Sequence, residues 1–199
     1  MEHIWKIVLL IVLFITIPRW LWGQGTKTKI ALLKGKGMAA ANPLFWRETI
    51  RYCNKNLHLS LADKPVEITA DDEDIFGYPY VFLAAEEDSS FMLLQTALFL
   101  EYLLAGGFLH INGDKKLSKV SLREIGKILP DAVYMDFSGD PSGLLSLPPS
   151  FRRAGKKEQG ACWGLMKEGR LMVLFTSGPL IVGEPGVVAD VLAYVFREE

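Results

Sequence analysis

Two acidic groups in the sequence have the residue types needed for acid–base chemistry or for binding a hard cation. Glu86, Glu87 and Asp88 follow the apolar run YVFLAA, and the turn DDEDIF at residues 71–76 precedes it. Neighbouring carboxylates can act as acid and base when their environments separate their pKa values, and carboxylate oxygens bind divalent cations. The alternative is that they are solvated capping residues, because Asp88 precedes an expected helix start. DDEDIF lacks the spacing of a calcium-binding loop.

Four polar side chains follow two strands that we expect to be neighbours. Glu86 and Asp88 come after the first of these strands, and Asn112 and Asp114 come after the second. In open α/β sheets, ligands bind at the edge formed by the carboxyl ends of the strands. We therefore expect any ligand site to be formed by Glu86, Asp88, Asn112 and Asp114. An enzyme would hold these carboxylates in a shared cleft, whereas a binding module would leave them apart in solvent.

Other catalytic, metal and cofactor motifs are missing from the sequence. His110 has no second histidine near it, and neither HExxH nor GxSxG occurs. Cys53 and Cys162 belong to no CxxC pattern, so a disulfide between them is left open, and it requires an oxidising compartment. We expect no metal, no cofactor and no catalytic residue, with His110 a hydrogen-bonded core residue.

The elements that must position these residues alternate between strands and helices. Short apolar runs rich in β-branched and aromatic residues predict strands, and apolar residues at helical spacing predict helices. The expected strands are 29–34, 65–69, 80–85, 108–111 and 132–135, with a hairpin over 164–177 that turns at Glu168-Gly169. Four helices are expected. The first starts at Pro43, the second spans Phe91 to Leu104, the third ends at Leu129 and the fourth covers 186–199. This alternation predicts an α/β three-layer sandwich with a mostly parallel sheet.

Two of the expected helices differ in their apolar pattern. The helix from Pro43 carries spaced apolar residues that we expect in the core, namely Leu44, Trp46, Ile50 and Cys53. The helix from Phe91 to Leu104 is apolar nearly all round. Such a helix is either well buried or packed against a partner or a membrane.

The composition indicates a folded domain with a short N-terminal extension. The chain has 199 residues, of which 50% are hydrophobic, and a net charge of −1. The near-neutral charge argues against a nucleic-acid partner, because such partners need a basic face. We expect an N-terminal segment at 1–23, a linker at 24–27 and one domain at 28–199.

The N-terminal segment is either a transmembrane anchor or a signal peptide. An unbroken apolar run covers Ile7 to Ile17 and is flanked by Lys6 and Arg19. The stretch from Ile4 to Trp22 approaches the length that crosses a bilayer, and its tryptophans suit the interfaces. Cleavage near Gly23 would need small residues that Leu-Trp-Gly does not provide. We favour the uncleaved anchor.

Several segments resemble one bacterial family. DDEDIFGYPYVFLA and EYLLAGGFLHINGD, at 71–84 and 101–114, resemble the domain of unknown function family numbered 4159, in which a YPf strand is followed by a helix and a GGfL corner. NPLFWRETIRYCNKNLHLSL and KEGRLMVLFTSGPL resemble its first helix and a late segment. The resemblance covers about residues 28–196. It implies a flavodoxin-like sheet of the class I glutamine-amidotransferase type in envelope-associated bacterial proteins.

The resemblance also bears on activity. In catalytic relatives of that fold, a cysteine follows the strand after the Gly-Gly corner, and here that position falls on Asn112. Asparagine is not a nucleophile, so we expect no amidotransferase activity. The sequence also departs from the family at Ala85–Asp88 and at Asp140-Pro141, where many members carry histidine-containing motifs.

The expected function is a non-catalytic binding or assembly module of the cell envelope. The alternative is a carboxylate- or metal-dependent hydrolase at the same sheet edge. The expected location is the bacterial inner membrane, with one crossing and a periplasmic domain; the alternative is secretion to the periplasm after signal cleavage. The expected partners are the membrane, through the N-terminal segment, and other envelope proteins.

Overall fold

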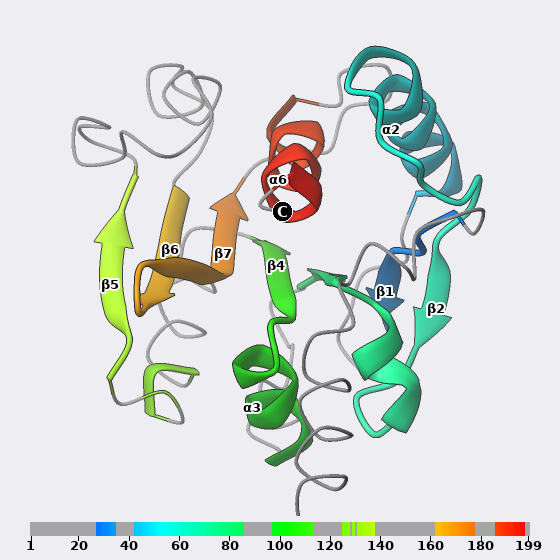
Figure 1. Cartoon of the computed structure of the whole chain (residues 1–199). Helices are drawn as coiled ribbons and strands as arrows, with labels where there is room; N and C mark the ends of the chain where they lie inside the picture. Colours follow the sequence, from blue (N-terminus) through cyan, green and yellow to red (C-terminus); the bar gives the residue numbers. More distant parts are fainter. Residues whose placement is uncertain are drawn as a thin grey trace, which may run out of the picture.

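The strands of the computed structural model form one mostly parallel sheet. The model describes residues 27–34, 42–85, 97–113, 125–127, 129, 131–137, 162–177 and 186–197. Within them, seven strands lie in the order β2-β1-β3-β4-β7-β6-β5 (Figure 1). Their bounds are β1 Ala31–Leu33, β2 Val66–Ile68, β3 Tyr80–Ala84, β4 Phe108–Gly113, β5 Val133–Asp136, β6 Cys162–Lys167 and β7 Arg170–Ser177. The neighbouring strands β2, β1, β3, β4 and β7 are parallel, whereas β6 is antiparallel to both of its neighbours, β7 and β5.

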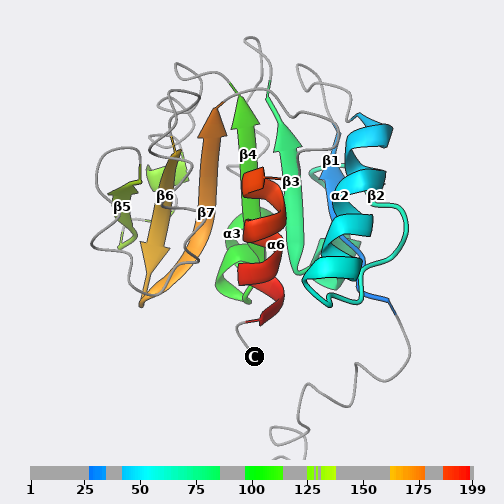
Figure 2. The same cartoon turned by 90° about the horizontal axis from the view of Figure 1, so that it is seen from above.

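Helices cover both faces of this sheet (Figures 1 and 2). The helices α2 (Pro43–Asn56) and α6 (Gly186–Arg197) pack on one face, and α3 (Ala97–Leu104) and the 3-10 helix η2 (Glu73–Gly77) pack on the other. Each face has its own apolar core. The predicted α/β architecture with a mostly parallel sheet is confirmed, and it fits a flavodoxin-like fold.

The strand register brings three strand ends to one edge. Ala84 of β3 pairs with Asn112 of β4, and Asn112 pairs with Thr176 of β7. Because these strands are parallel, their carboxyl ends share this side of the sheet, which we call the carboxyl edge. From β1 the chain passes to β2 on one side and then crosses back to β3 on the other side of β1, so a topological switch point lies between β1 and β3.

The helix α2 begins as the sequence predicts, but one of its expected core residues is exposed. Asn42 Oδ1 accepts from the backbone N–H of Leu44 (3.0 Å) and of Phe45 (3.3 Å), which caps the helix. Three of the four expected core residues are buried, but the prediction for Leu44 is wrong because its exposure is 44%. At 100° per residue Leu44 points about opposite to Trp46, and Phe45 takes the core position instead.

The Gly-Gly corner between α3 and β4 is a close-packed turn. Gly106 has φ +108°, which glycine adopts freely. Gly107 lies against the ring of Tyr102, whose hydroxyl donates to the Tyr78 carbonyl (3.0 Å) and accepts from the Phe108 N–H (3.1 Å). These bonds tie the end of α3 to the starts of β3 and β4.

The predicted hairpin is confirmed, with β6 starting two residues earlier than expected. Glu168 has φ 53° and Gly169 has φ 80°, the two positive values that a type I′ turn requires. The final helix and the strands β1, β2, β3, β4 and β5 also lie where the sequence predicts them, with small shifts in their ends. No helix in the part of the chain that the structure describes is long and apolar enough to cross a membrane. The N-terminal segment 1–23 lies outside the described residues.

Candidate functional site

One of the four expected site residues falls in the described part of the chain. Asn112 lies in β4 near the carboxyl edge and is half-buried. Glu86, Asp88 and Asp114 lie outside the described residues. Whether Glu86 and Asp114 share a cleft therefore stays a prediction.

Asn112 belongs to a polar network of four side chains that crosses β3, β4 and β7. Its Nδ2 donates to Thr176 Oγ1 (3.1 Å). His110 Nε2 lies 2.8 Å from the same oxygen, and His110 Nδ1 lies 2.7 Å from the hydroxyl of Tyr80. Tyr80 and His110 are fully buried, and Thr176 is 8% exposed. The network thus runs from the core on the α2 side of the sheet to its carboxyl edge.

Burial fixes His110 in its neutral form. Its ring packs edge-on against Phe82, with centroids 5.1 Å apart, inside an apolar core. Because this surrounding cannot solvate a charged imidazole, burial lowers the pKa of His110 to about 3. The prediction that His110 is a hydrogen-bonded core residue is confirmed.

The positions of the hydrogens follow from this neutrality. A neutral imidazole has one donor and one acceptor. If Tyr80 donates to Nδ1, then Nε2–H donates to Thr176 Oγ1, and the two fully buried side chains, Tyr80 and His110, both have partners. The other tautomer leaves the buried Tyr80 hydroxyl hydrogen without an acceptor among the described residues, at a cost of about 1–3 kcal/mol. We therefore assign the first arrangement, in which the hydrogen of the Thr176 hydroxyl is left for an acceptor outside the network.

The described residues at this edge do not form a nucleophile elbow. Outside glycine, positive φ angles in the described chain occur at His58 and Glu168 alone. Asn112 therefore has ordinary strand geometry, whereas an elbow nucleophile sits on a strained turn. Its side chain is instead held by Thr176.

Both cysteines are buried, and the disulfide between them that the sequence left open is not formed. Burial, with a smaller contribution from Asp190, raises the pKa of Cys53 to about 12. Burial, with a smaller contribution from Asp136, raises the pKa of Cys162 to about 12. At neutral pH both are protonated, and a protonated thiol is neither a nucleophile nor a metal ligand.

A thiol reagent tests this conclusion. We expect Cys53 and Cys162 in the folded chain to react with a disulfide reagent at least about a thousandfold more slowly than after denaturation, because their thiolate fraction falls by that factor. Release of the chromophore before and after adding guanidinium measures the two rates. Rapid reaction of either thiol in the folded state would contradict the burial described above.

The acidic turn before β3 has a structural role in the described chain. Asp72 Oδ1 accepts from the Asp74 N–H (2.9 Å) and caps η2, as the capping interpretation expects. A hydrogen bond from Thr69 lowers the pKa of Asp71. No three His, Cys, Asp or Glu residues among those described lie close enough to hold a metal ion.

The described part of the apolar helix leaves one large side chain in solvent. Phe99, Tyr102 and Leu103 are buried, but Leu104 is 53% exposed, and Phe76 of the adjoining η2 is 48% exposed. Residues 91–96 lie outside the described chain. The alternative that this helix exposes a face to a partner therefore stays untested.

The comparison with known families now places the chain. A family model described as Domain of unknown function (DUF4159) matches residues 29–178. The chain belongs to this family. The match covers β1 to β7 and includes all four residues of the network, so the predicted family is confirmed. A search of the curated proteins gives no match. The match ends before α6, although Val188 and Leu192 of that helix are buried in the same core as Phe82.

Two members of the network were missed in the sequence. The sequence places Tyr80 and Thr176 in apolar strands, and it predicts that His110 is hydrogen-bonded in the core but does not identify its partners. The signal was a polar residue at the end of each buried run, Thr176 after LMVLF and Asn112 after FLHI. This pattern indicates strand ends but not which of them meet.

Proposed function

We propose that this domain is a membrane-tethered binding module of the bacterial cell envelope that holds its partner at the carboxyl edge of β3, β4 and β7. The observation that carries the proposal is the network of Asn112, Thr176, His110 and Tyr80. In the assigned arrangement the network leaves the Thr176 hydroxyl as a donor at the edge, and it keeps His110 neutral and bonded at both nitrogens. Such a group recognises an acceptor, whereas a general base needs a nitrogen with an accessible lone pair.

The chemistry of the remaining candidates supports binding over acyl transfer. Cys53 and Cys162 are buried and protonated. Asn112 stands at the end of the strand that follows the Gly-Gly corner, and its amide is bonded to Thr176. We infer that the sheet is of the class I glutamine-amidotransferase type with asparagine in the place of the nucleophile.

The position of the chain start supports a tether that leaves this edge open. Lys27 and Thr28 precede β1, so they lie at the amino end of the parallel strands, opposite to Asn112 and Thr176 (Figure 2). An anchor in residues 1–23 would therefore join the domain at the end opposite to its carboxyl edge and leave that edge open.

Site-specific photo-crosslinking in membranes tests the proposed edge. A benzoylphenylalanine at Ser177, at the end of β7, should give a discrete adduct with an envelope protein. The same group at the exposed Pro79, before β3, is the control and should give none. Thr176→Val keeps the shape of the side chain and removes the hydroxyl, so it should weaken the adduct about tenfold, the effect of one hydrogen bond. Equal adducts from both positions, or an adduct unchanged by Thr176→Val, would contradict the proposal.

The hydrolase alternative has its own test. Calorimetric titration of the full chain with Ca²⁺ or Mn²⁺ should show no binding that depends on the predicted carboxylates. Binding that is lost in a Glu86→Gln, Asp114→Asn variant would favour the metal-dependent hydrolase and overturn the non-catalytic proposal.

The proposed location is the inner membrane, with residues 1–23 uncleaved and the domain in the periplasm. The intact mass of the membrane-extracted chain should include residues 1–23, and a shorter mass would indicate a cleaved signal. Alkaline phosphatase fused after Glu199 should be active, since it folds only outside the cytoplasm. Fluorescence from a reporter that is fluorescent only in the cytoplasm, fused at the same position, would instead place the domain in the cytoplasm.

A further inference from the structure

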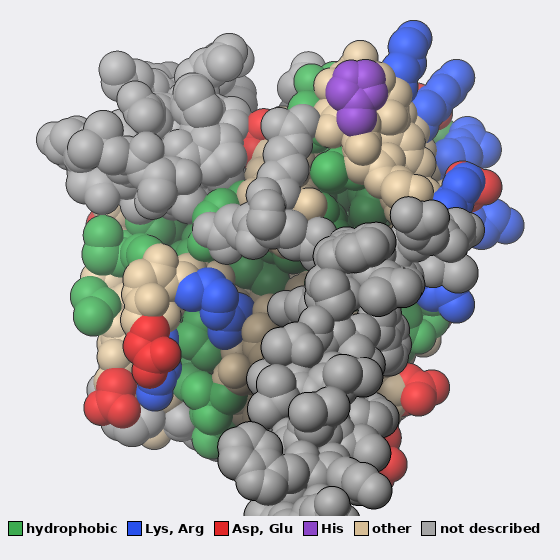
Figure 3. All heavy atoms as spheres, in the orientation of Figure 1, with side chains coloured by type: hydrophobic (Ala, Val, Ile, Leu, Met, Phe, Trp, Pro, Cys, Tyr) green, Lys and Arg blue, Asp and Glu red, His purple; other side chains and the backbone are tan. Residues whose placement is uncertain are grey.

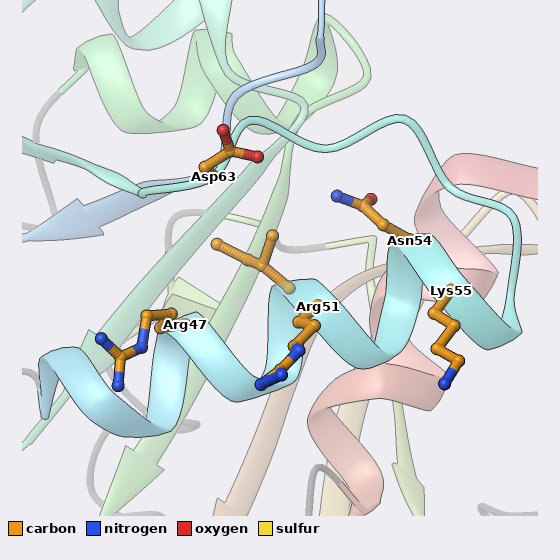
Figure 4. A pocket seen from close by; sticks show the side chains of 6 residues that line it. Arg47, Arg51, Asn54, Lys55 and Asp63 are labelled. Carbon is orange, nitrogen blue, oxygen red and sulfur yellow. The ribbon is translucent and has the colours of Figure 1, made fainter.

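The outer side of α2 carries a row of basic side chains beside an open pocket. Arg47, Arg51 and Lys55 follow one another at four-residue spacing, which places them on one side of the helix, and all three are exposed. We call these three residues the basic row. Figure 4 shows their charged ends on the same side of α2, with Asp63 across the pocket. The pocket has a volume of about 450 Å³ and is lined by Arg47, Ile50, Arg51, Asn54, Lys55 and Asp63.

Acidic neighbours neutralise only part of this charge. Lys27 Nζ lies 2.6 Å from Asp63 Oδ1, and Arg51 Nη1 lies 3.2 Å from Glu48 Oε1. Together with Arg47 and Lys55 of the basic row, this makes four basic side chains beside two acidic ones, Asp63 and Glu48. The acidic turn at 71–74 lies on the other face of the sheet, beside α3. Figure 3 shows several Lys and Arg side chains gathered where α2 lies, with acidic side chains among them and others further down.

Backbone contacts fix the start of the domain next to the basic row. The Thr28 N–H donates to the Ser60 carbonyl (2.7 Å), and the Ala62 N–H donates to the Thr28 carbonyl (2.8 Å). Asn54 of α2 holds the same segment, because its side chain donates to the Leu61 carbonyl (3.0 Å) and accepts from the Leu61 N–H (2.9 Å). The segment around Thr28, which precedes β1, is therefore held next to the basic helix.

The distance to the apolar N-terminal segment is short. Five residue steps join Trp22 to Lys27, and at about 3.5 Å per residue they span at most about 18 Å. An anchor in residues 1–23 would hold the basic row close to the bilayer surface, at a high effective concentration. A net charge of −1 for the whole chain leaves a nucleic acid without the broad basic face it needs.

We propose that the basic row of α2 docks on the anionic lipid headgroups of the membrane that holds the N-terminal segment. This inference rests on the membrane tether of the proposed function. Each Lys or Arg near an anionic bilayer favours the bound state by about fivefold. Docking on the α2 side directs the opposite face of the sheet, which carries the acidic turn at 71–74, away from the bilayer.

Lysine footprinting of the full chain in nanodiscs tests the docking. Acetylation of Lys55, read by mass spectrometry, should be about fivefold slower in phosphatidylcholine mixed with phosphatidylglycerol than in phosphatidylcholine alone. High salt should abolish the difference. Lys127 is the control, because it is exposed next to Ile125 on the other face of the sheet, and its rate should be the same in both lipids.

A variant and a soluble ligand complete the design. Arg47→Gln with Arg51→Gln should remove the protection of Lys55 in the anionic nanodiscs, whereas Lys127→Gln should leave it unchanged. Equal rates at Lys55 in the two lipids would overturn the proposal. So would protection by inorganic phosphate in phosphatidylcholine alone, which would assign the pocket to a soluble anion. Extraction of the chain from the membrane by alkaline carbonate would contradict the membrane tether itself. A chain that stays in the membrane while Lys55 is unprotected would contradict only the docking.

Discussion

Replacing Gly107 by alanine should lower the free energy of unfolding by about 3 kcal/mol, a large part of the stability of a domain this size. A Cβ atom at this position would lie 2.2 Å from Cζ and 2.3 Å from Cε2 of Tyr102. The ring cannot yield easily, because its hydroxyl is bonded to the Tyr78 carbonyl and the Phe108 N–H. Its face and edge also contact Phe99 and Phe76.

Chemical denaturation of the full chain in mild detergent, followed by tryptophan fluorescence, measures this loss. Gly77→Ala is the matched control, since a Cβ there meets nothing within 4 Å, and its stability should change by less than about 0.5 kcal/mol. Adding Tyr102→Leu to Gly107→Ala should cost less than the two single changes together, because the clash is removed. Equal stability of the two alanine variants would contradict the close packing at the corner.

The second large effect is a loss of stability in mild acid caused by His110. Its pKa is about 3 in the folded chain and about 6.5 when unfolded. Between these values the unfolded chain binds a proton that the folded chain does not. The stabilising contribution is therefore complete above pH 6.5 and is lost as the pH falls towards 3, by about 1.4 kcal/mol per pH unit. From pH 7.5 to pH 5 the expected loss is about 2 kcal/mol.

Denaturation curves between pH 5 and pH 7.5 test this loss of stability. Ordinary carboxylates titrate below this pH range. His110→Gln should be less stable at every pH, because Tyr80 and Thr176 lose bonds, but the slope with pH should be flatter by about 1.4 kcal/mol per unit. His58→Asn is the control, since His58 is exposed and its φ of 56° is one that asparagine tolerates. A wild-type slope that persists in His110→Gln would show that another group causes it.

Local patterns in the sequence determined most of the elements of this protein. Asn42-Pro43 begins α2, Glu168-Gly169 turns the hairpin, and the apolar runs mark the strands, since caps, turns and strand patterns depend on adjacent residues. Their alternation was sufficient to predict the mostly parallel sheet. The error at Leu44 arose within a local pattern, because its neighbour Phe45 lies on the side of the helix that meets the sheet.

Tertiary structure alone decided which residues act together. Tyr80 and His110 are 30 positions apart, and His110 and Thr176 are 66 apart. They meet because β4 lies between β3 and β7, and the strand order is set by packing across the whole sheet rather than by any local segment. The same holds for the basic row, since only the pairing of Thr28 with the segment around Leu61 places Arg47, Arg51 and Lys55 beside the start of the domain. The sequence determined the elements, and the long-range strand pairing determined both the network at the carboxyl edge and the basic surface beside the N-terminal segment.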